Sequence, residues 1–444
     1  MIESAVDLWY ALPAAAQDAA LAAALLAPAA LGLALAGTGL ATGPPARALV
    51  RGHPGTAAAF VALIALSVGI AIAVSVQERG LRQGTARAAD PFDVIVTAPG
   101  SEITAMLATV YLQSAPLPLV EAARWRAVAE HPATRLAAPL AFGDSVAGHP
   151  LVGTTGELVA HLLGRTAPGR AVDGRLFARA DEAVAGAATR FAVGETVVPA
   201  HGVGFVESEH AGTTLEIVGR LPVTGTPWDG AVVAPIETTW LVHGLGDGHG
   251  GEAARGRRRL GPPFDPASMP GVPAIVALVG SYPDAYALRG EFGDGTTMAF
   301  FPGEVLARLH AVLGDVRRAM STLALATQIL VAIAVLLALA ILVRGFARRF
   351  DMLHALGAPR RYVFAVVWRY AVTLLALGTA LGLGVGAALA AALARALGAR
   401  TGVDMTAGLA ASDAVPVAGF ALVAVALAAV PAAVAARRGG RERR

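Results

Sequence analysis

The sequence predicts an α-helical membrane protein with five transmembrane helices plus a large α+β extracytoplasmic domain on a helical stalk. Two apolar runs without acidic residues, Ser321–Leu342 and Tyr362–Leu393, each exceed the roughly 20 residues that a helix needs to cross a bilayer core. Composition agrees, because 55% of the 444 residues are hydrophobic, 15% are charged and the mean hydropathy is +0.60. The third observation is the basic segment Arg344–Arg361 between the two runs, which indicates a loop on the cytoplasmic face.

Charge placement predicts one orientation for all spans. The segment before the first span carries acidic and no basic residues, and the first basic residue, Arg47, follows that span. We therefore expect the protein in the inner membrane of a bacterial cell, with its N-terminus in the periplasm. The segment Arg344–Arg361 and the tail 437–444 should then lie in the cytoplasm. The spans are expected at Asp18–Thr42, Ala57–Gln77, Met320–Val343, Tyr362–Leu393 and Val415–Ala436.

The same pattern divides the chain into segments. The expected segments are an N-terminal one with an extra span (1–46), a basic loop with the second span (47–78), the extracytoplasmic domain with its stalk (79–318), three spans around the segment 344–361 (319–436) and a basic cytoplasmic tail (437–444).

The connection between the second and third spans, about 240 residues, is too long for a loop and predicts a folded domain. Helices are expected at Pro118–Glu130 and Ser281–Phe292, and a loop without apolar periodicity at His243–Pro263. Mixed elements in irregular order favour an α+β domain. Strands are expected at Phe92–Ala98, Glu195–Ala200, Thr213–Val223, Ala231–Ile236 and Pro273–Val279.

A stalk is predicted from helical spacing on both sides of this domain. From Glu304 the apolar residues keep a helical period up to Met320, so one helix is expected over Glu304–Arg349, about 70 Å long. That length is more than twice the hydrocarbon thickness, so the excess should project outward. The polar stretch Glu78–Arg87 after the second span is compatible with a helix that pairs with it.

Residue usage excludes several functions. All 35 basic side chains are Arg, and a P-loop needs a Lys on the phosphates, so ATP and Mg²⁺ are expected on a partner and no cofactor on this chain. The absence of Cys excludes disulfides and thiolate chemistry. Arg gathered at membrane edges explains the pI of about 9.6 through lipid headgroups, with no nucleic-acid partner.

Histidines raise the question of a metal site. His201 and His210 lie near two glutamates, and His243 and His249 lie in the glycine-rich loop. Their spacing matches no metal motif, so solvated loops are the favoured interpretation and a metal site the weaker one. A hydrolase could be imagined from Ser101, Asp144, Ser145 and His149, but no G-x-S-x-G elbow accompanies them.

Trp228 and Asp229 follow a Gly-Thr-Pro turn. A structural turn is the favoured interpretation, and a contact with a substrate or partner is the alternative.

The segment RRFDMLHALGAPRRYVF resembles the E-I-x-x-L-R-A-L-G-A-x-R-x-x-I segment of FtsX-like permeases, whose members include lipoprotein-releasing permeases and the macrolide exporter. Arg349 stands where the family usually has Glu, and His354 replaces its usual Arg. The stretch Gly174–Val197 is similar to the family's G-R-x-F…E-x-V-x-G…G-D pattern, and the extra first span departs from its usual four. A narrower likeness rests on PFDVIVTAPGS, TGTPWD and GTTMAFFP.

This resemblance implies a permease subunit of an ABC-type complex. A cytoplasmic ATPase would dock on the loop, a second permease copy would complete the pair, and an adaptor or lipoprotein would join in the periplasm. The chain itself would not be an enzyme. The alternative is a non-transporting transmitter that regulates a periplasmic hydrolase or sensor. The implied ATPase-coupling residues are Arg349, Asp351, Leu353, Leu356, Gly357 and Ala358.

Overall fold

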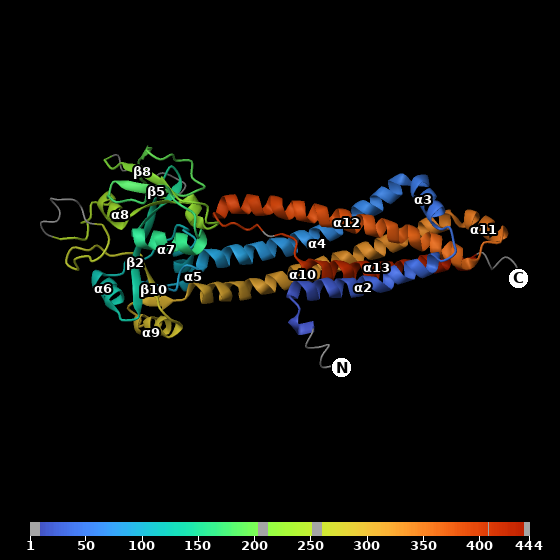
Figure 1. Ribbon diagram of the computed structural model, residues 1–444, viewed down its shortest axis with the longest axis horizontal. Helices are drawn as coiled ribbons and strands as arrows, with labels where there is room; N and C mark the ends of the chain where they lie inside the picture. Colours follow the sequence, from blue (N-terminus) through green and yellow to red (C-terminus); the bar gives the residue numbers. More distant parts are fainter. Residues whose placement is uncertain (1–8, 203–211, 251–259, 407, 439–444) are drawn as a thin grey trace. The chain divides into compact units, whose positions relative to one another are not determined.

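The computed structural model describes residues 9–202, 212–250, 260–406 and 408–438 (Figure 1). The chain forms two compact units. The helical unit comprises Met1–Arg79, Asp315–Ala394 and Thr406–Arg444, and the sheet unit comprises Gly80–Gly314 and Arg395–Met405.

Long helices dominate the helical unit. Its elements are α2 (Ala14–Gly37), α3 (Gly43–Gly52), α4 (Pro54–Ala89), α10 (Pro302–Gly345), α11 (Ala347–Ala355), α12 (Arg360–Thr401) and α13 (Ala411–Arg438), of which α4, α10 and α12 also have residues in the sheet unit. The predicted continuation of the second span as a helix is confirmed, because α4 runs to Ala89. The helix predicted to reach Arg349 ends earlier, at Gly345.

Four described helices are long and apolar enough to cross a membrane, and they correspond to the first, second, fourth and fifth predicted spans. They are Ala14–Gly32, Pro54–Ala89, Arg360–Thr401 and Ala411–Arg437. The third predicted span, Met320–Val343, lies in α10, where part of the side chains fall outside the described ones. Its crossing of a membrane stays a prediction.

Glycines bring α12 and α4 into close contact. Gly378, Gly382 and Gly386 recur every four residues and therefore share one face of α12. A Cβ added at Gly382 would lie 2.8 Å from the Cβ of Val68, closer than side chains approach. Small residues at this spacing let two helix backbones pack closely where the hydrophobic effect gives little help.

An apolar core joins α3, α4, α11, α12 and α13. Phe60 and Ile64 of α4, Tyr370 and Leu374 of α12 and Val425 of α13 are among its buried members. The extra N-terminal helix α2 lies along α13 (Figure 1).

The sheet unit is built on one mixed sheet. Its helices are α5 (Glu102–Thr109), α6 (Ala122–Glu130), α7 (Gly156–Thr166), α8 (Ile236–Val242) and α9 (Tyr282–Phe292), with a 3₁₀ turn η1 (Pro227–Gly230). Its strands are β1 (Val94–Thr97), β2 (Thr134–Val146), β3 (His149–Thr154), β4 (Asp173–Gly174), β5 (Glu182–Ala185), β6 (Thr196–Val197), β7 (Ala200–His201), β8 (Leu215–Arg220), β9 (Val232–Pro235), β10 (Ala274–Val279) and β11 (Met298–Phe300).

The strand order is β11-β1-β10-β2-β3-β9-β5-β8-β4, with β7 on β2 and β6 on β8. Only the β3–β9 and β5–β8 pairs are parallel among the described strands. The long strand β2 joins two halves, each with its own core. One core gathers side chains of β1, β10, α6 and α9 around Trp125 and Phe292, and the other gathers β5, β8 and β9 around Phe191.

The predicted α+β class is confirmed for this unit, with differences in its elements. The strands expected near β1, β8, β9 and β10 are present. The sequence pattern did not predict β2, β3, β4, β5 or β11, of which β2 and β3 lie in the middle of the sheet. The strand expected at Glu195–Ala200 is present as β6 only over Thr196–Val197. The helix predicted from Pro118 begins instead at Ala122, because Val120 forms a bridge with Val272 in extended conformation.

Candidate functional site

The segment between α10 and α12 forms a short amphipathic helix, α11. The chain leaves helical geometry at Phe346, which is the N-cap of α11. Phe346 and Phe350 are buried in the core of the helical unit, and Leu353 packs against the same core. These apolar contacts hold the helix on the bundle.

The other face of α11 is open to solvent. Arg349, Asp351 and Met352 are exposed, and the guanidinium of Arg349 lies 5.1 Å from the ring centroid of Phe346. Phe350, Leu353 and Leu356 have helical spacing, which predicts one common apolar face, but the Leu356 side chain is 79% exposed. Met352, four residues earlier, is 63% exposed, so two large apolar side chains face solvent at this end of α11.

Leu356 is exposed because the helix ends before it. Gly357 has φ of +92°, a conformation that glycine adopts without strain. Its N–H donates to the carbonyl of His354, and the N–H of Ala358 donates to the carbonyl of Leu353. This pair of bonds is a Schellman cap. Gly357 and Ala358 therefore fix the end of α11 and present Leu356 outward.

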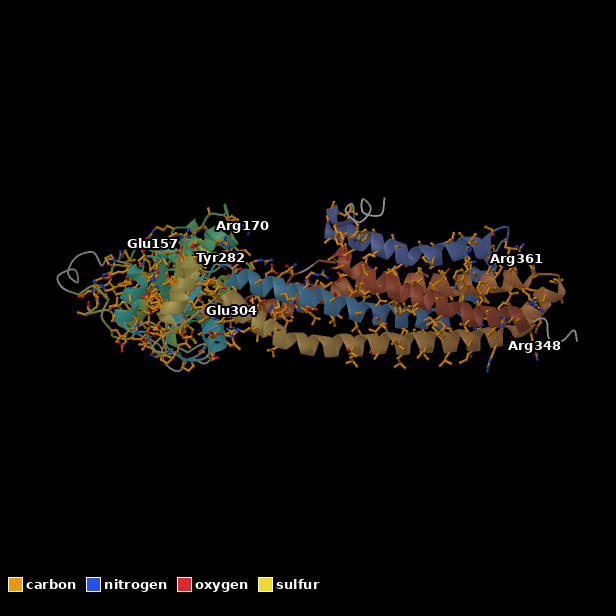
Figure 2. All side chains as sticks on the ribbon, turned by 90° about the horizontal axis from the view of Figure 1, so that it is seen from below. Glu157, Arg170, Tyr282, Glu304, Arg348 and Arg361 are labelled. Atoms are coloured by element: carbon orange, nitrogen blue, oxygen red, sulfur yellow. The ribbon has the colours of Figure 1, made fainter. Side chains whose placement is uncertain are left out.

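Basic segments gather at this end of the helical unit. The short helix α3 buries Ala46 and Leu49 in the same core as Phe346, and exposes Arg51. The C-terminal helix α13 contacts α11. Figure 2 shows the side chains of Arg348 and Arg361 at this end. The basic loop predicted after the first span is thus helical over Gly43–Gly52.

Within the sheet unit, the pattern of Gly174–Val197 contains an ion pair. Arg175 makes two hydrogen bonds with the carboxylate of Glu182, at 2.7 and 2.6 Å, and the N–H of Ala178 donates to the same group at 2.8 Å. The Glu182 side chain is 5% exposed. The bonds with Arg175 lower the pKa of Glu182 to about 2.

The turn that contains Trp228 and Asp229 is buried. The Trp228 residue is 4% exposed, and one carboxylate oxygen of Asp229 accepts bonds from the N–H and the hydroxyl of Thr224. The backbone of this turn lies against Gly186, where a Cβ would collide with the carbonyl oxygen of Trp228. These contacts give the turn a structural role, and a contact with a substrate or partner stays a prediction.

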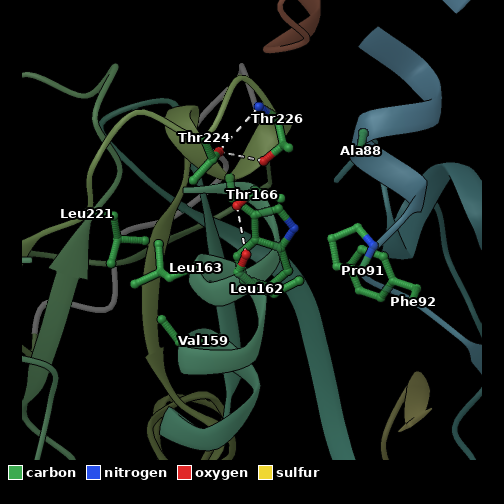
Figure 3. Close-up of a pocket in the computed structure, with 11 residues that line it drawn as sticks. Ala88, Pro91, Phe92, Val159, Leu162, Leu163, Thr166, Leu221, Thr224 and Thr226 are labelled. Atoms are coloured by element: carbon green, nitrogen blue, oxygen red, sulfur yellow. Dashed lines mark hydrogen bonds between the residues drawn. The ribbon is translucent and has the colours of Figure 1, made fainter. Parts of the chain in front are cut away.

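Two hollows lie in the sheet unit. The one beside Trp228 and Leu162 has room for hardly more than a water molecule, and Figure 3 shows the hydrogen-bonded Thr224 and Thr226 at its edge. The other is a groove of about 1160 Å³ that α4, α9 and α10 line, with exposed Tyr282 and Tyr286. No sequence motif pointed to the residues that line this groove.

The histidine candidates separate into two places. His201 and His243 meet at Asp144, with nitrogen–oxygen distances of 3.1 and 3.0 Å. His249 is buried and lies 3.3 Å from Glu237, whose pKa burial raises. His210 lies outside the described residues.

The imagined hydrolase residues do not form a triad. Ser101 caps α5 by accepting a bond from the N–H of Thr104, and His149 Nδ1 bonds to the carbonyl of Gly230. The Ser145 hydroxyl is buried and makes no hydrogen bond with a described residue.

Comparison with known proteins identifies the membrane part. Residues 321–440 match the family model for the C-terminal part of FtsX-like permeases. A search of curated proteins gave no match. Among solved structures, the chain is similar to the periplasmic region of MacB from Actinobacillus actinomycetemcomitans, at 8% identity and a TM-score of 0.30, over 51% of this chain and 95% of that one. The matched family segment contains α11 with its cap, α12 and α13. The similarity to FtsX-like permeases thus rests on these C-terminal helices, within residues 321–440.

Proposed function

We propose that this chain is the transmembrane permease subunit of an ABC-type complex. A separate cytoplasmic subunit would bind ATP and Mg²⁺, and this chain would couple its hydrolysis to export or extraction of a substrate on the periplasmic side. The observation that carries the proposal is the exposed face of α11, with Leu356 presented by the cap, inside the segment that matches the family.

Docking of the ATPase would use the exposed side of α11. Leu356 and Met352 offer apolar area, and Arg349 and Asp351 offer charges around it, the combination found at protein interfaces. The buried side, Phe346 and Phe350, would pass a displacement of α11 to the core of the helical unit.

The test is a Leu356→Glu variant of the full chain. We expect it to fold and insert, because the side chain is exposed, but to lose the nucleotide-binding subunit on purification in detergent. Leu119→Glu, the same change at an exposed site of the sheet unit, is the matched control and should retain that subunit. Equal amounts of the ATPase with both variants would place docking elsewhere on the chain.

In the orientation that we propose, α11 lies on the cytoplasmic side of the inner membrane and the sheet unit lies in the periplasm. Helix α10 is then the third of five spans. The grouping of α3, α11 and the end of α13 supports this, because basic residues are retained on the cytoplasmic side. A single Cys at Tyr282 should react with an impermeant thiol reagent in spheroplasts, and one at Leu356 only after lysis. The opposite labelling pattern would invert the topology.

Transmission in this proposal is mechanical. The long helices α4 and α10 would act as the stalk between the membrane and the periplasmic domain. A second copy of the chain, membrane lipid and a periplasmic adaptor or lipoprotein are the further partners that we propose. The alternative is a transmitter that uses the same coupling to regulate a periplasmic hydrolase or sensor. ATPase coupling without substrate movement in reconstituted vesicles would favour the transmitter.

A further inference from the structure

We propose that Asp144, His201 and His243 form a binding site for a divalent transition-metal cation of the zinc type. The three side chains come from three parts of the sheet unit: β2, the end of β7 and the residue after α8. This site does not depend on the proposed transport function, and its test does not need a substrate or an ATPase.

The donor atoms converge on one point. His201 Nδ1 lies 3.1 Å from one carboxylate oxygen of Asp144, and His243 Nε2 lies 3.0 Å from the other. The two imidazoles stack with ring centroids 5.1 Å apart and an angle of 27° between their planes. One ligand atom from each residue falls within 4.8 Å of the other two. Both histidines therefore direct a nitrogen to the same side of the carboxylate.

These separations suit a tetrahedral ion. Zinc binds imidazole nitrogen and carboxylate oxygen at about 2.0–2.1 Å, so neighbouring ligands of a tetrahedron are about 3.3 Å apart. The two nitrogen–oxygen distances, each to a different oxygen of Asp144, differ from that value by only a few tenths of an ångström. The three ligand atoms lie within 4.8 Å of one another, so binding of an ion would draw them closer together. Three protein ligands leave a fourth position for water.

The backbone holds Asp144 in place. The pairing of β2 with β3 shifts register between Ala141 and Asp144, and Gly143 has φ of +136° at this bulge. A bulge re-aims the side chain that follows it. Asp144 also pairs directly with His201 across the β2–β7 ladder. Two of the three ligands are therefore positioned by sheet geometry before any ion binds.

Exposure makes the site reachable and its donors select the ion. The Asp144 side chain is 4% exposed, whereas those of His201 and His243 are about 40% exposed. The carboxylate is thus fixed and the imidazoles face solvent, from which an ion can enter. Two imidazoles and one carboxylate suit zinc and its neighbours, whereas calcium and magnesium prefer oxygen ligands alone.

The test measures metal directly on the full chain in detergent, purified through a tag without histidine and stripped with a chelator. Equilibrium dialysis against Zn²⁺ with elemental analysis gives the stoichiometry, and Co²⁺ gives visible bands whose intensity reports tetrahedral coordination. We expect one ion per chain. Zinc affinity should fall at least roughly tenfold in His201→Ala and in His243→Ala.

Two further variants sharpen the result. His131→Ala removes a histidine that also lies 3.1 Å from a carboxylate, that of Glu291, but that has no third ligand among the described residues. This variant should bind zinc as the parent chain does. Asp144→Asn keeps the shape of the buried side chain and should weaken zinc binding like the histidine variants. Absence of bound zinc in the parent chain, or equal binding by the His201 and His243 variants, would overturn the proposal.

Discussion

The ion pair between Arg175 and Glu182 gives the pattern that begins at Gly174 a measurable consequence for stability. Glu182→Gln keeps the size of the side chain and removes its charge, so the two charge-assisted bonds with Arg175 become weaker neutral ones. Because the carboxylate is almost fully buried, solvent cannot replace these bonds.

The pKa of Glu182 sets both the size and the pH range of the effect. The interval between the ordinary value of 4.5 and about 2 corresponds to about 3 kcal/mol, and we expect a loss of about 1–3 kcal/mol at pH 7. A carboxyl group whose pKa is lower in the folded state than in the unfolded state stabilises the fold, and this stabilisation is complete above the unfolded pKa. The contribution is lost as pH falls from about 4.5 to about 2.

The assay is unfolding of the full chain in detergent, followed by tryptophan emission between pH 7 and pH 3. Three of the five tryptophans, Trp125, Trp228 and Trp240, are buried in the sheet unit and report its unfolding. Asp181→Asn is the control, because Asp181 also pairs with an arginine but is well exposed, and it should change little.

Two outcomes would refute this reasoning. If Glu182→Gln were as stable as the parent chain at pH 7, the buried pair would make no net contribution to folding. If the stability difference stayed constant from pH 7 to pH 3, a cause other than the carboxylate charge would be responsible. We expect instead that the difference narrows as the pH approaches 3.

Two further predictions concern the helical unit. Gly382→Ala should destabilise the chain in detergent by about 1–3 kcal/mol, because the new methyl group meets Val68. Gly384→Ala is the control and should not destabilise it, because there is open space around Gly384. Thermal unfolding compares the two variants, and equal effects would contradict the close packing. Asp413→Asn should cost about 3 kcal/mol, because it leaves Arg79 without the carboxylate 2.5 Å away. Unchanged unfolding of this variant would show that the pair adds no stability.

The membrane helices were predictable because a bilayer imposes a minimum apolar length that a sequence displays directly. The bounds of α11 were less predictable. Leu356 follows Phe350 and Leu353 at helical spacing, which predicted one common face. The Schellman cap at Gly357 ends the helix first and exposes Leu356. Glycine after a periodic segment is the signal for this stop, and it was present in the sequence.

The central strand β2 was not predictable from local pattern. Its sequence contains Pro139 and Gly143 and is rich in alanine, and these residues are poor strand formers. Pairing with β10 on one side and β3 on the other outweighs that preference. Local propensity could not reveal this, because both partners are distant in sequence or themselves weak.

The histidine cluster illustrates the same limit. His201 and His243 were recognised as weak metal candidates, but their shared ligand was not. Asp144 lies 57 residues before His201 and was considered only as a hydrolase residue. The pairing of β2 with β7 brings it beside His201, and the contact of α8 with β2 brings His243 to the same place.

The placement of charge within the helical unit favours helix movement over ion movement. The stretches 54–77 of α4, 370–394 of α12 and 414–436 of α13 contain no charged residue. The partly buried pair of Arg79 and Asp413 joins α4 and the N-terminal end of α13. Apolar and glycine contacts dominate the core of the described helices, where Trp368 Nε1 also donates a hydrogen bond to the carbonyl of Val425.

Ionisable residues inside membrane spans mark ion pathways, and these three stretches contain no charged residue. The glycine face of α12 formed by Gly378, Gly382 and Gly386 is already occupied by α4 within the chain. It is therefore not free to join two copies, and a dimer must use another surface. The exposed apolar residues of α10, among them Leu323, Leu330 and Leu337 at intervals of seven, provide one. A single Cys at Leu330 should then form a disulfide between copies, and one at Gly382 should not.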